Sequence, residues 1–587
     1  DVQQYDVVTN LNMGQLLPRK WGIQLPFNYS RGEELITPLY DPEFQDIELE
    51  TRIDNTADAA EKDQIRDQSV EYTKRQSVNF IGVRKERTGD KKPQPYDIEN
   101  ITLSYSYNQV DHNSFEVEES LEQNVRVGAT YDYSFEPKTY EPFKNNDSIF
   151  RSSYWQLLKD FNINYLPTNI SASSNIIRQY NEQKFREINL LPGNIGLPTL
   201  YQRNFLFDWQ YAVNYNLTNS LRFNFNASNN RIVQNFIDEE GIINNDIGVW
   251  DGFFDVGEPN QHFQTLQVNY DLPFNKVPFL RFIRATYSYT GNYQWQRGSD
   301  LFRNIELELE DGTVGIFDLG NTVQNSNTHR ITAIGLLTAI KRAQFNYQEN
   351  NGIYLPGYLQ SVGFMGSLKP SVGFVFGGQG EVRELAARKG WLTIYPEFNE
   401  QYTEVENIQL DYQTNIELLP DLKIDLNGRR AYSESFAENY IVQDDQYRSL
   451  TPRTFGNFNI STILIKTAFS TSDENSSETF QKFRDNRTII AKRLAVLLPA
   501  FLSAYSGTDP SKVKTGIFRN FPIPNWELRY TGLMKIDWFK KTFKRFSIQH
   551  GYRADYTVNQ FETNLDYNRN NPTELDQSGK SKEWNIL

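Results

Sequence analysis

Cysteine is absent from this 587-residue chain, and histidine and methionine are scarce, with four and three copies. A chain without cysteine has no disulfide framework, no thiolate metal ligand and no thiol nucleophile. No two of the histidines stand at the spacing of a metal site. We therefore expect no catalytic residue, no metal site and no cofactor, and we do not expect an enzyme.

Positive charge is also in deficit, and long apolar runs are missing. The formal net charge is -14, which argues against a nucleic-acid partner because such a partner needs a basic surface. No apolar run reaches the ~18 residues that a membrane-spanning helix needs, so no transmembrane helix is expected. The chain opens at Asp1 without a methionine or a signal peptide, and we expect it to be a mature or excised piece of an exported protein.

What the sequence has in abundance is aromatic residues, 14% of the chain, arranged in strict alternation with polar ones. Between positions 205 and 217 the odd residues are apolar and most even residues are polar, with Leu206 and Ala212 as exceptions. The same pattern recurs at 101–107, 125–135, 161–165, 221–227, 266–272, 285–295, 408–418 and 422–426. Period-two alternation indicates β-strands with one apolar and one polar face.

The length of these rows separates two kinds of β protein. Strands of soluble sandwiches and solenoids also alternate, but globular strands usually run about five or six residues. A row such as 205–217 spans roughly 43 Å at ~3.3 Å per residue, which a tilt of about 45° reduces to the ~30 Å of a hydrocarbon core. The sequence therefore predicts an all-β fold, a very large transmembrane antiparallel β-barrel of the outer-membrane type, with small helical and loop insertions.

Alternation assigns the side chains of such a barrel to lipid or to the lumen. The residues predicted to face lipid are Phe205, Phe207, Trp209, Tyr211, Val213, Tyr215, Leu217, Val125, Val127, Tyr131, Tyr133, Tyr287, Tyr289, Leu410 and Tyr412. The residues predicted to face the lumen are Asp208, Gln210, Asn214, Asn216, Asn224, Asn226, Asp411 and Gln413.

Connections are predicted to alternate in length, short on the periplasmic side and long outside. Short turns are expected at 166–168, 218–220 and 419–421, and long segments at 84–99, 137–152, 180–202, 229–262 and 298–328. The up-and-down order fails between 454 and 525, where one crossing is missing or the strand at 455–468 does not cross.

Two insertions interrupt the single barrel assigned to residues 1–587. Residues 351–391 are predicted to be a non-strand insertion with a short helix at 381–389, and residues 470–520 a helical insertion with an amphipathic helix at 478–505. Both are expected in the lumen or on a rim. The acidic run at 306–311 alternates with apolar residues and is expected to be a solvated loop hairpin.

Several long stretches resemble the SprA/Sov family, the outer-membrane translocon of the type 9 secretion system. They are LLPRKWGIQLPFNYSRGEEL at 16–35, NYQENNGIYLPGYLQSVGF at 346–364, VRELAARKGWLT at 382–393, IIAKRLAVLLPAFLSAYSGTDPSKV at 489–513, RNFPIPNWELRYTGL at 519–533 and WFKKTFKRFSIQHGYRADYTV at 538–558. Because family members are far longer than this chain, the resemblance implies that it is part of one.

The resemblance implies a function and a set of partners. It implies an integral outer-membrane channel that exports folded cargo proteins and opens sideways through its wall, with a role in gliding motility. The implied partners are a PorV-like porin-type barrel at the lateral opening, a periplasmic plug protein, secreted cargo, an inner-membrane motor acting indirectly, and membrane lipid with lipopolysaccharide. The alternative is a TonB-dependent or porin-like transporter of small solutes.

A barrel of about 36 strands, as the resemblance suggests, would have a backbone diameter of roughly 70 Å. A folded domain of ~300 residues has a diameter of about 50 Å and could pass. Such a pore must be occluded at rest, by residues 351–391, by residues 470–520, by a plug partner, or by several of these together.

Overall fold

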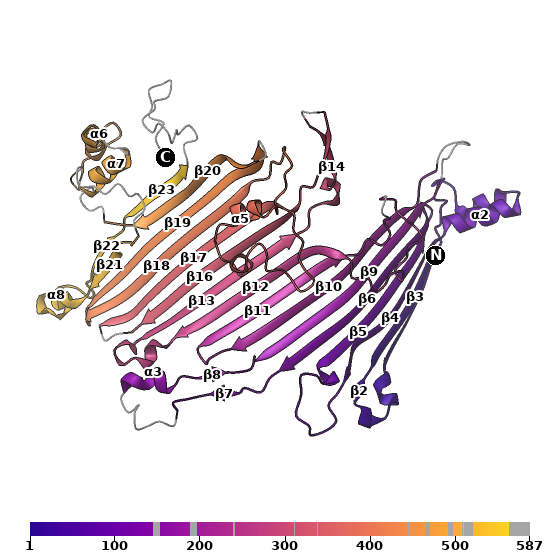
Figure 1. The fold of residues 1–587 in the computed structure, drawn as a ribbon, viewed down its shortest axis with the longest axis horizontal. Helices are drawn as coiled ribbons and strands as arrows, with labels where there is room; N and C mark the ends of the chain where they lie inside the picture. Colours follow the sequence, from indigo (N-terminus) through magenta and orange to yellow (C-terminus); the bar gives the residue numbers. More distant parts are fainter. Residues whose placement is uncertain are drawn as a thin grey trace.

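The computed structural model describes residues 1–144, 153–187, 196–238, 241–309, 312–336, 339–443, 446–463, 470–490, 497–507, 509 and 520–562. They form one large, curved, antiparallel sheet of 19 strands, with short helices at its two ends and beside it (Figure 1). The all-β antiparallel fold predicted from the alternation is therefore confirmed. No helix among the described residues is long and apolar enough to cross a membrane.

The sheet strands follow the chain in order, and nearly every strand pairs with the next. They are β1 (Val2–Asn12), β2 (Ile23–Gln24), β3 (Pro26–Ile36), β4 (Glu71–Lys85), β5 (Ile101–Asn113), β6 (Val117–Ser134), β9 (Asn169–Phe185), β10 (Leu200–Asn216), β11 (Leu221–Ile232), β12 (Glu258–Leu272), β13 (Ile283–Gln296), β16 (Asn321–Gly335), β17 (Ile340–Tyr358), β18 (Tyr402–Leu419), β19 (Leu422–Gln443), β20 (Gln446–Ser461), β21 (Asn525–Tyr530), β22 (Ile548–Tyr552) and β23 (Asp555–Glu562). Most are much longer than globular strands, as the alternating rows predict.

Helices and two small hairpins complete the described elements. The α-helices are α1 (Leu49–Asn55), α2 (Ala59–Ser69), α3 (Gln156–Lys159), α4 (Val372–Val375), α5 (Arg383–Arg388), α6 (Glu478–Ile490), α7 (Leu497–Ser506) and α8 (Asp537–Thr542). The 3-10 helices are η1 (Met13–Leu16), η2 (Arg19–Trp21), η3 (Ile98–Asn100), η4 (Ser153–Trp155), η5 (Pro273–Lys276), η6 (Pro278–Leu280), η7 (Asp300–Phe302) and η10 (Gly532–Lys535). The hairpins pair β7 (Thr139–Tyr140) with β8 (Ile163–Asn164), and β14 (Ile305–Glu308) with β15 (Val314–Phe317).

These elements confirm some local predictions and correct others. The helices at 381–389 and 478–505 are present as α5 and as α6 with α7, and β14–β15 is the expected loop hairpin. The non-strand insertion predicted at 351–391 begins later than predicted, because β17 continues to Tyr358. The row at 161–165 is not a wall strand, since only Ile163 and Asn164 pair there, with β7.

Three crossings of the wall are built from two half-strands each. β2 and β3 both pair with β4, and β20 and β21 both pair with β19. In the last crossing, β22 pairs with β21 and β23 pairs with β20. The crossing expected to be missing between 454 and 525 is thus present. β20 supplies its first half, the chain leaves the sheet at 462–524, and β21 supplies the second half.

Ser461 closes the break between β20 and β21. Its Oγ donates to the carbonyl oxygen of Ile523 at 2.8 Å and accepts from the amide of Arg429 at 3.1 Å. The amide of Ile523 in turn donates to the carbonyl of Ser461 at 3.0 Å. A serine hydroxyl suits this point because it donates and accepts at once, so the ladder continues across an excursion that contains α6 and α7.

The pairing registers define two rims of the sheet. At the end named here the turn rim lie the described residues of 13–22, 86–100, 135–168, 217–220, 273–282, 336–339, 419–421 and 531–547. At the opposite end, the loop rim, lie the described residues of 37–70, 114–116, 186–199, 233–257, 297–320 and 359–401. The predicted alternation of lengths is therefore wrong for 86–99, 137–144 and 166–168, which belong to long connections at the turn rim, where 218–220 and 419–421 are tight turns. Residues 145–152 of the predicted segment 137–152 lie outside the described residues.

The two outermost strands keep unpaired edges within the described residues. β1 pairs only with β3, β22 pairs only with β21, and β23 pairs only with β20. In a bilayer each unpaired backbone group costs several kcal/mol, so an open sheet of this width needs further strands to close it.

We therefore predict that residues 1–587 expressed alone do not form a closed barrel. Refolding into detergent should give aggregated or heterogeneous material, because the edges at β1 and at β22–β23 seek other strands. Size-exclusion chromatography with heat-modifiable electrophoretic mobility measures this. A monodisperse, heat-stable monomer would show that the prediction is wrong.

Candidate functional site

The candidate site of this chain is a pair of surfaces, the two faces of the sheet. In the β10–β11 ladder, Val213 lies opposite Phe225 and Asn214 opposite Asn224, and the registers carry this separation through the neighbouring strands. The residues predicted to face lipid all share one side, the aromatic face. Those predicted to face the lumen all share the other, the polar face.

The polar face is lined by neutral amides and hydroxyls that bond to one another across strands. The Asn28 amide donates to Asn10 at 2.6 Å, the Asn79 amide donates to Asn28 at 3.0 Å, and the Ser106 hydroxyl donates to Asn79 at 2.6 Å. One such row thus crosses β1, β3, β4 and β5. Thr265, Asn292 and Ser326 form a similar row on β12, β13 and β16. The result is a hydrated wall with few strong charges.

A hollow of about 760 Å³ on the polar face lies across β17, β18, β19, β21 and β22. Its lining includes Asp411, Arg429, Glu527, Arg553 and Asp555, so opposite charges are interspersed there. No group of three or more metal-ligating side chains occurs among the described residues.

The aromatic face has two zones, and the loop-side zone is covered by the chain itself. Residues 359–391 pack there and form the largest apolar core of the protein. Its buried members are Tyr293, Trp295, Val323, Ile353, Leu355, Tyr358, Val362, Phe374, Val375, Val382, Ala386, Leu392 and Tyr402.

Polar side chains of the sheet fix this segment by its backbone. Asn325 donates to the carbonyls of Phe374 at 3.0 Å and Gly378 at 2.7 Å, and Asn327 donates to Gly377 at 2.7 Å. The segment comes so close that a Cβ on Gly291 would lie 2.1 Å from the carbonyl oxygen of Phe376. Buried carbonyls need such donors, so the amides on the sheet specify where the segment lies.

Arginines hold two further parts of the loop rim. Arg178 is fully buried and donates to the carbonyls of Leu206 at 3.0 Å, Phe253 at 2.9 Å and Asp255 at 3.0 Å, which brings 249–255 onto the sheet. Arg383 of α5 lies between Glu381 and the buried Glu438.

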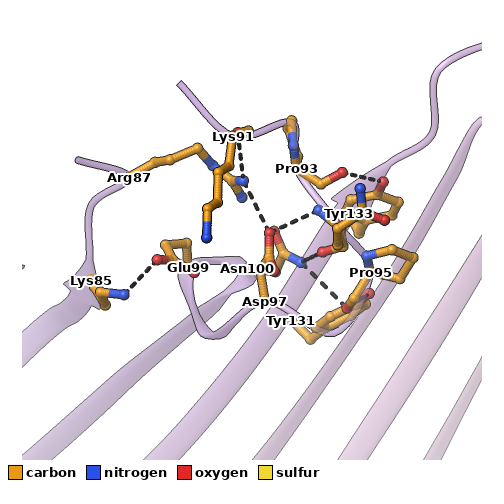
Figure 2. A network of polar contacts seen from close by, with 11 residues as sticks. Lys85, Arg87, Lys91, Pro93, Pro95, Asp97, Glu99, Asn100, Tyr131 and Tyr133 are labelled. Carbon is orange, nitrogen blue, oxygen red and sulfur yellow. Dashed lines mark hydrogen bonds and ion pairs between the residues drawn. The ribbon is translucent and has the colours of Figure 1, made fainter. Parts of the chain in front are cut away.

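At the turn rim, a loop covers Tyr131 and Tyr133 (Figure 2). The Tyr131 hydroxyl donates to the carbonyl of Pro95 at 2.7 Å, and the Tyr133 hydroxyl to that of Pro93 at 3.1 Å. Asp97 holds the loop in shape, because it accepts from the amide of Gln94 at 2.8 Å and pairs with Arg87 at 3.0 Å. The Gln94 amide and the nearby Arg87 hold the pKa of the Asp97 carboxyl below its usual value, against the opposing effect of desolvation.

The helical insertion also reaches the aromatic face. Phe501 of α7 packs against Tyr556, with 6.0 Å between ring centroids, beside the buried Phe458 and Ile460. Within the predicted insertion at 470–520, residues 491–496, 508 and 510–519 lie outside the described residues.

Several residues predicted to face lipid are therefore covered by protein. The prediction is wrong for the buried Val125, Tyr133, Phe205, Trp209 and Leu410. Protein groups also contact Phe207, Tyr211, Tyr131, Tyr215, Tyr289 and Tyr412. Contact with lipid stays a prediction for Val127, Val213, Leu217 and Tyr287, and contact with the lumen stays one for the polar-face residues.

A sequence signal for the covered zone exists and was missed. The apolar rows are broken by polar residues on the same face, such as His262 and Gln264 before Leu266, or Asn325 and Asn327 before Ile331. A polar residue in a lipid-facing row would be costly, so it marks where the row leaves the membrane zone or gains a protein partner.

Comparison with known proteins identifies a family at the start of the chain. The SprA_N family, described as a motility related/secretion protein, matches residues 1–53. No curated protein matches. Among solved structures, the ferric enterobactin receptor (PfeA) in complex with BCV-L6 matches at 9% identity and a TM-score of 0.24, over 79% of this chain and 63% of the receptor. The chain thus spans less than two thirds of that receptor, and the TM-score is too low to indicate a shared fold.

We predict that the loop in Figure 2 loosens when Asp97 loses its charge. A carboxyl whose pKa is lowered by folding stabilises the folded loop at any pH above its unfolded pKa of about 3.9. This stabilisation is lost as the pH falls through the folded-state pKa. Asp97→Asn should therefore speed trypsin cleavage after Arg87 or Lys91 at neutral pH, measured by mass spectrometry. Asp90→Asn in the same loop is the control, and equal cleavage of the two variants would contradict the role of Asp97.

The uncovered zone of the aromatic face yields a second prediction. An arginine at mid-bilayer costs roughly 2–4 kcal/mol on the lipid side and far less in the lumen. Val213→Arg should therefore lower the amount of folded protein in the outer membrane, whereas the neighbouring Asn214→Arg should not. Quantitative immunoblots of membrane fractions measure the difference, and equal levels would refute the assignment of the two faces.

Proposed function

We propose that this chain, which belongs to the SprA/Sov family through residues 1–53, forms part of the wall of a protein-conducting channel in the outer membrane. In this proposal the channel exports folded cargo proteins by type 9 secretion and serves gliding motility. The observation that carries the proposal is the two-sided wall, with an aromatic face for lipid and a neutral polar face for water.

The polar face suits the passage of folded proteins. Its Asn, Ser, Thr and Gln side chains satisfy one another across strands, as in the row from Asn10 to Ser106. A passing protein would meet a hydrated surface whose hydrogen bonds are already made. Some opposite charges on this face also pair across strands, as Arg222 does with Asp271 at 2.5 Å, which lowers their tendency to hold a passing protein.

The open edges support a barrel larger than this chain. Because β1 and β22–β23 have no further pairing strand among the described residues, we propose that the remaining wall comes from more of the same protein or from a partner. A PorV-like barrel at a lateral opening, a periplasmic plug and an inner-membrane motor are proposed as partners. We propose no enzymatic step, and the energy would come from the motor.

Occlusion of the pore is proposed to depend on the plug partner more than on this chain. Residues 359–391 and Phe501 of α7 lie against the aromatic face, so they do not fill the space in front of the polar face. These contacts support a place for residues 359–391 at the rim over a place in the lumen.

The proposal is tested by cross-linking cargo in transit. A photoreactive amino acid at Asn214 or Asn224 of the full-length protein should cross-link exported proteins in cells arrested during secretion, because these residues share the polar face. The same group at Val213 or Phe223, on the aromatic face, is the matched control and should not. Mass spectrometry identifies the adducts.

Two results would contradict the proposal. Absence of exported proteins from the polar-face adducts would favour the TonB-dependent or porin-like transporter of small solutes. Equal cross-linking from both faces would show that the polar face does not line the path.

A further inference from the structure

Residues 532–547, between β21 and β22, form an exposed aromatic and basic projection at the turn rim. Figure 1 shows its helix α8 beyond the lower end of the sheet. The rings of Trp538, Phe539, Phe543 and Phe546 pack together, with centroids 4.9–6.0 Å apart. Yet the Trp538 side chain remains 62% exposed. The cluster therefore packs mainly on itself and leaves aromatic surface uncovered.

The charge of this projection opposes that of the whole chain. It holds five cations, Lys535, Lys540, Lys541, Lys544 and Arg545, against the single acid Asp537, while the chain carries a net charge of -14. Lys535 pairs with Asp421 and so ties the projection to the tight turn at 419–421. The other four are exposed and make no ion pair within the part of the chain that the structure describes.

Other segments of the same rim repeat the combination. Phe279 is 66% exposed in the connection that also holds Lys276 and Arg281, and Trp21 is exposed beside Arg19 and Lys20. Between α3 and η5 lies a cavity of about 320 Å³, lined by apolar side chains such as Leu157, Leu217 and Tyr270. Lys276 and Asp160 also line it and pair with each other at 3.2 Å.

The loop rim has the opposite charge. Residues 37–70, which carry α1 and α2, contain ten acids and three cations. The two rims therefore differ in charge, with an acidic segment at the loop rim and a basic one at the turn rim.

We propose that residues 532–547 bind the headgroups of anionic phospholipids in the leaflet that meets the turn rim. This inference rests on the proposed membrane placement of the sheet. Aromatic rings favour the interface between headgroups and acyl chains, and Lys and Arg attract phosphate. The aromatic face continues directly into the projection, because Leu422, Tyr530 and Ile548 lie side by side on it at the turn-rim ends of β19, β21 and β22. Lipid that coats this face therefore meets the cations at its edge.

The test uses the full-length protein in nanodiscs made from equal parts of phosphatidylglycerol and phosphatidylcholine. Lipid extracted with the purified protein should be enriched in phosphatidylglycerol. Each cation near an anionic leaflet contributes about fivefold in binding, so the quadruple variant Lys540→Gln, Lys541→Gln, Lys544→Gln, Arg545→Gln should lose this enrichment several-fold. Raised ionic strength should have the same effect, since screening acts over about 8 Å at physiological salt.

A second quadruple variant is the matched control. Lys62→Gln, Arg388→Gln, Lys389→Gln and Arg484→Gln remove four cations from outside the turn rim and should leave the enrichment unchanged. Equal enrichment in wild type and the first variant overturns the inference. So does loss of a copurifying acidic protein from that variant with its lipid unchanged, which would assign the projection to a protein partner. Failure of the wild type to enter nanodiscs would instead count against the proposed membrane function.

Discussion

The structure depends on one constraint: the backbone N–H and C=O groups of the sheet must be paired within the protein, which the proposed crossing of a membrane would make obligatory. Long antiparallel strands meet it, and their period of two then gives each crossing one apolar and one polar face. The break between β20 and β21 shows how strictly the pairing is maintained. Although the chain leaves the sheet at 462–524, Ser461 and Ile523 exchange hydrogen bonds across the gap, so the ladder beside β19 continues.

The same constraint explains where the chain can cover its own wall. Toward the loop rim, strands carry amides and charges on the aromatic face, and these residues accept segments whose carbonyls need donors. Asn325 and Asn327 hold 374–378, and Arg178 holds 249–255. Toward the turn rim the face is mostly apolar, from Val213 to Tyr287, and the described residues that cover it there belong to the loops at its margin. Under the proposed membrane placement, this distribution leaves a zone for lipid between two protein-covered margins.

The sequence predicted the sheet well because alternation over a long row has one structural solution. The opposite faces of Val213 and Asn214 came from that pattern alone. What the pattern could not predict is which part of an apolar row meets lipid and which meets another segment. Phe205 and Val213 look alike in sequence, yet Phe205 is buried beneath 233–253. The crossing split at Ser461 was also beyond local pattern, because its halves are joined only by tertiary contacts between residues 62 positions apart.

The central claim is that the two faces of one strand meet different media, and a cysteine scan of β10 tests it most directly. The chain has no cysteine, so each engineered one at 212–216 is unique within it. We predict that a water-soluble maleimide labels positions 212, 214 and 216 in membranes, and that positions 213 and 215 react only after detergent is added. Labelling that is uniform from one residue to the next would contradict the account.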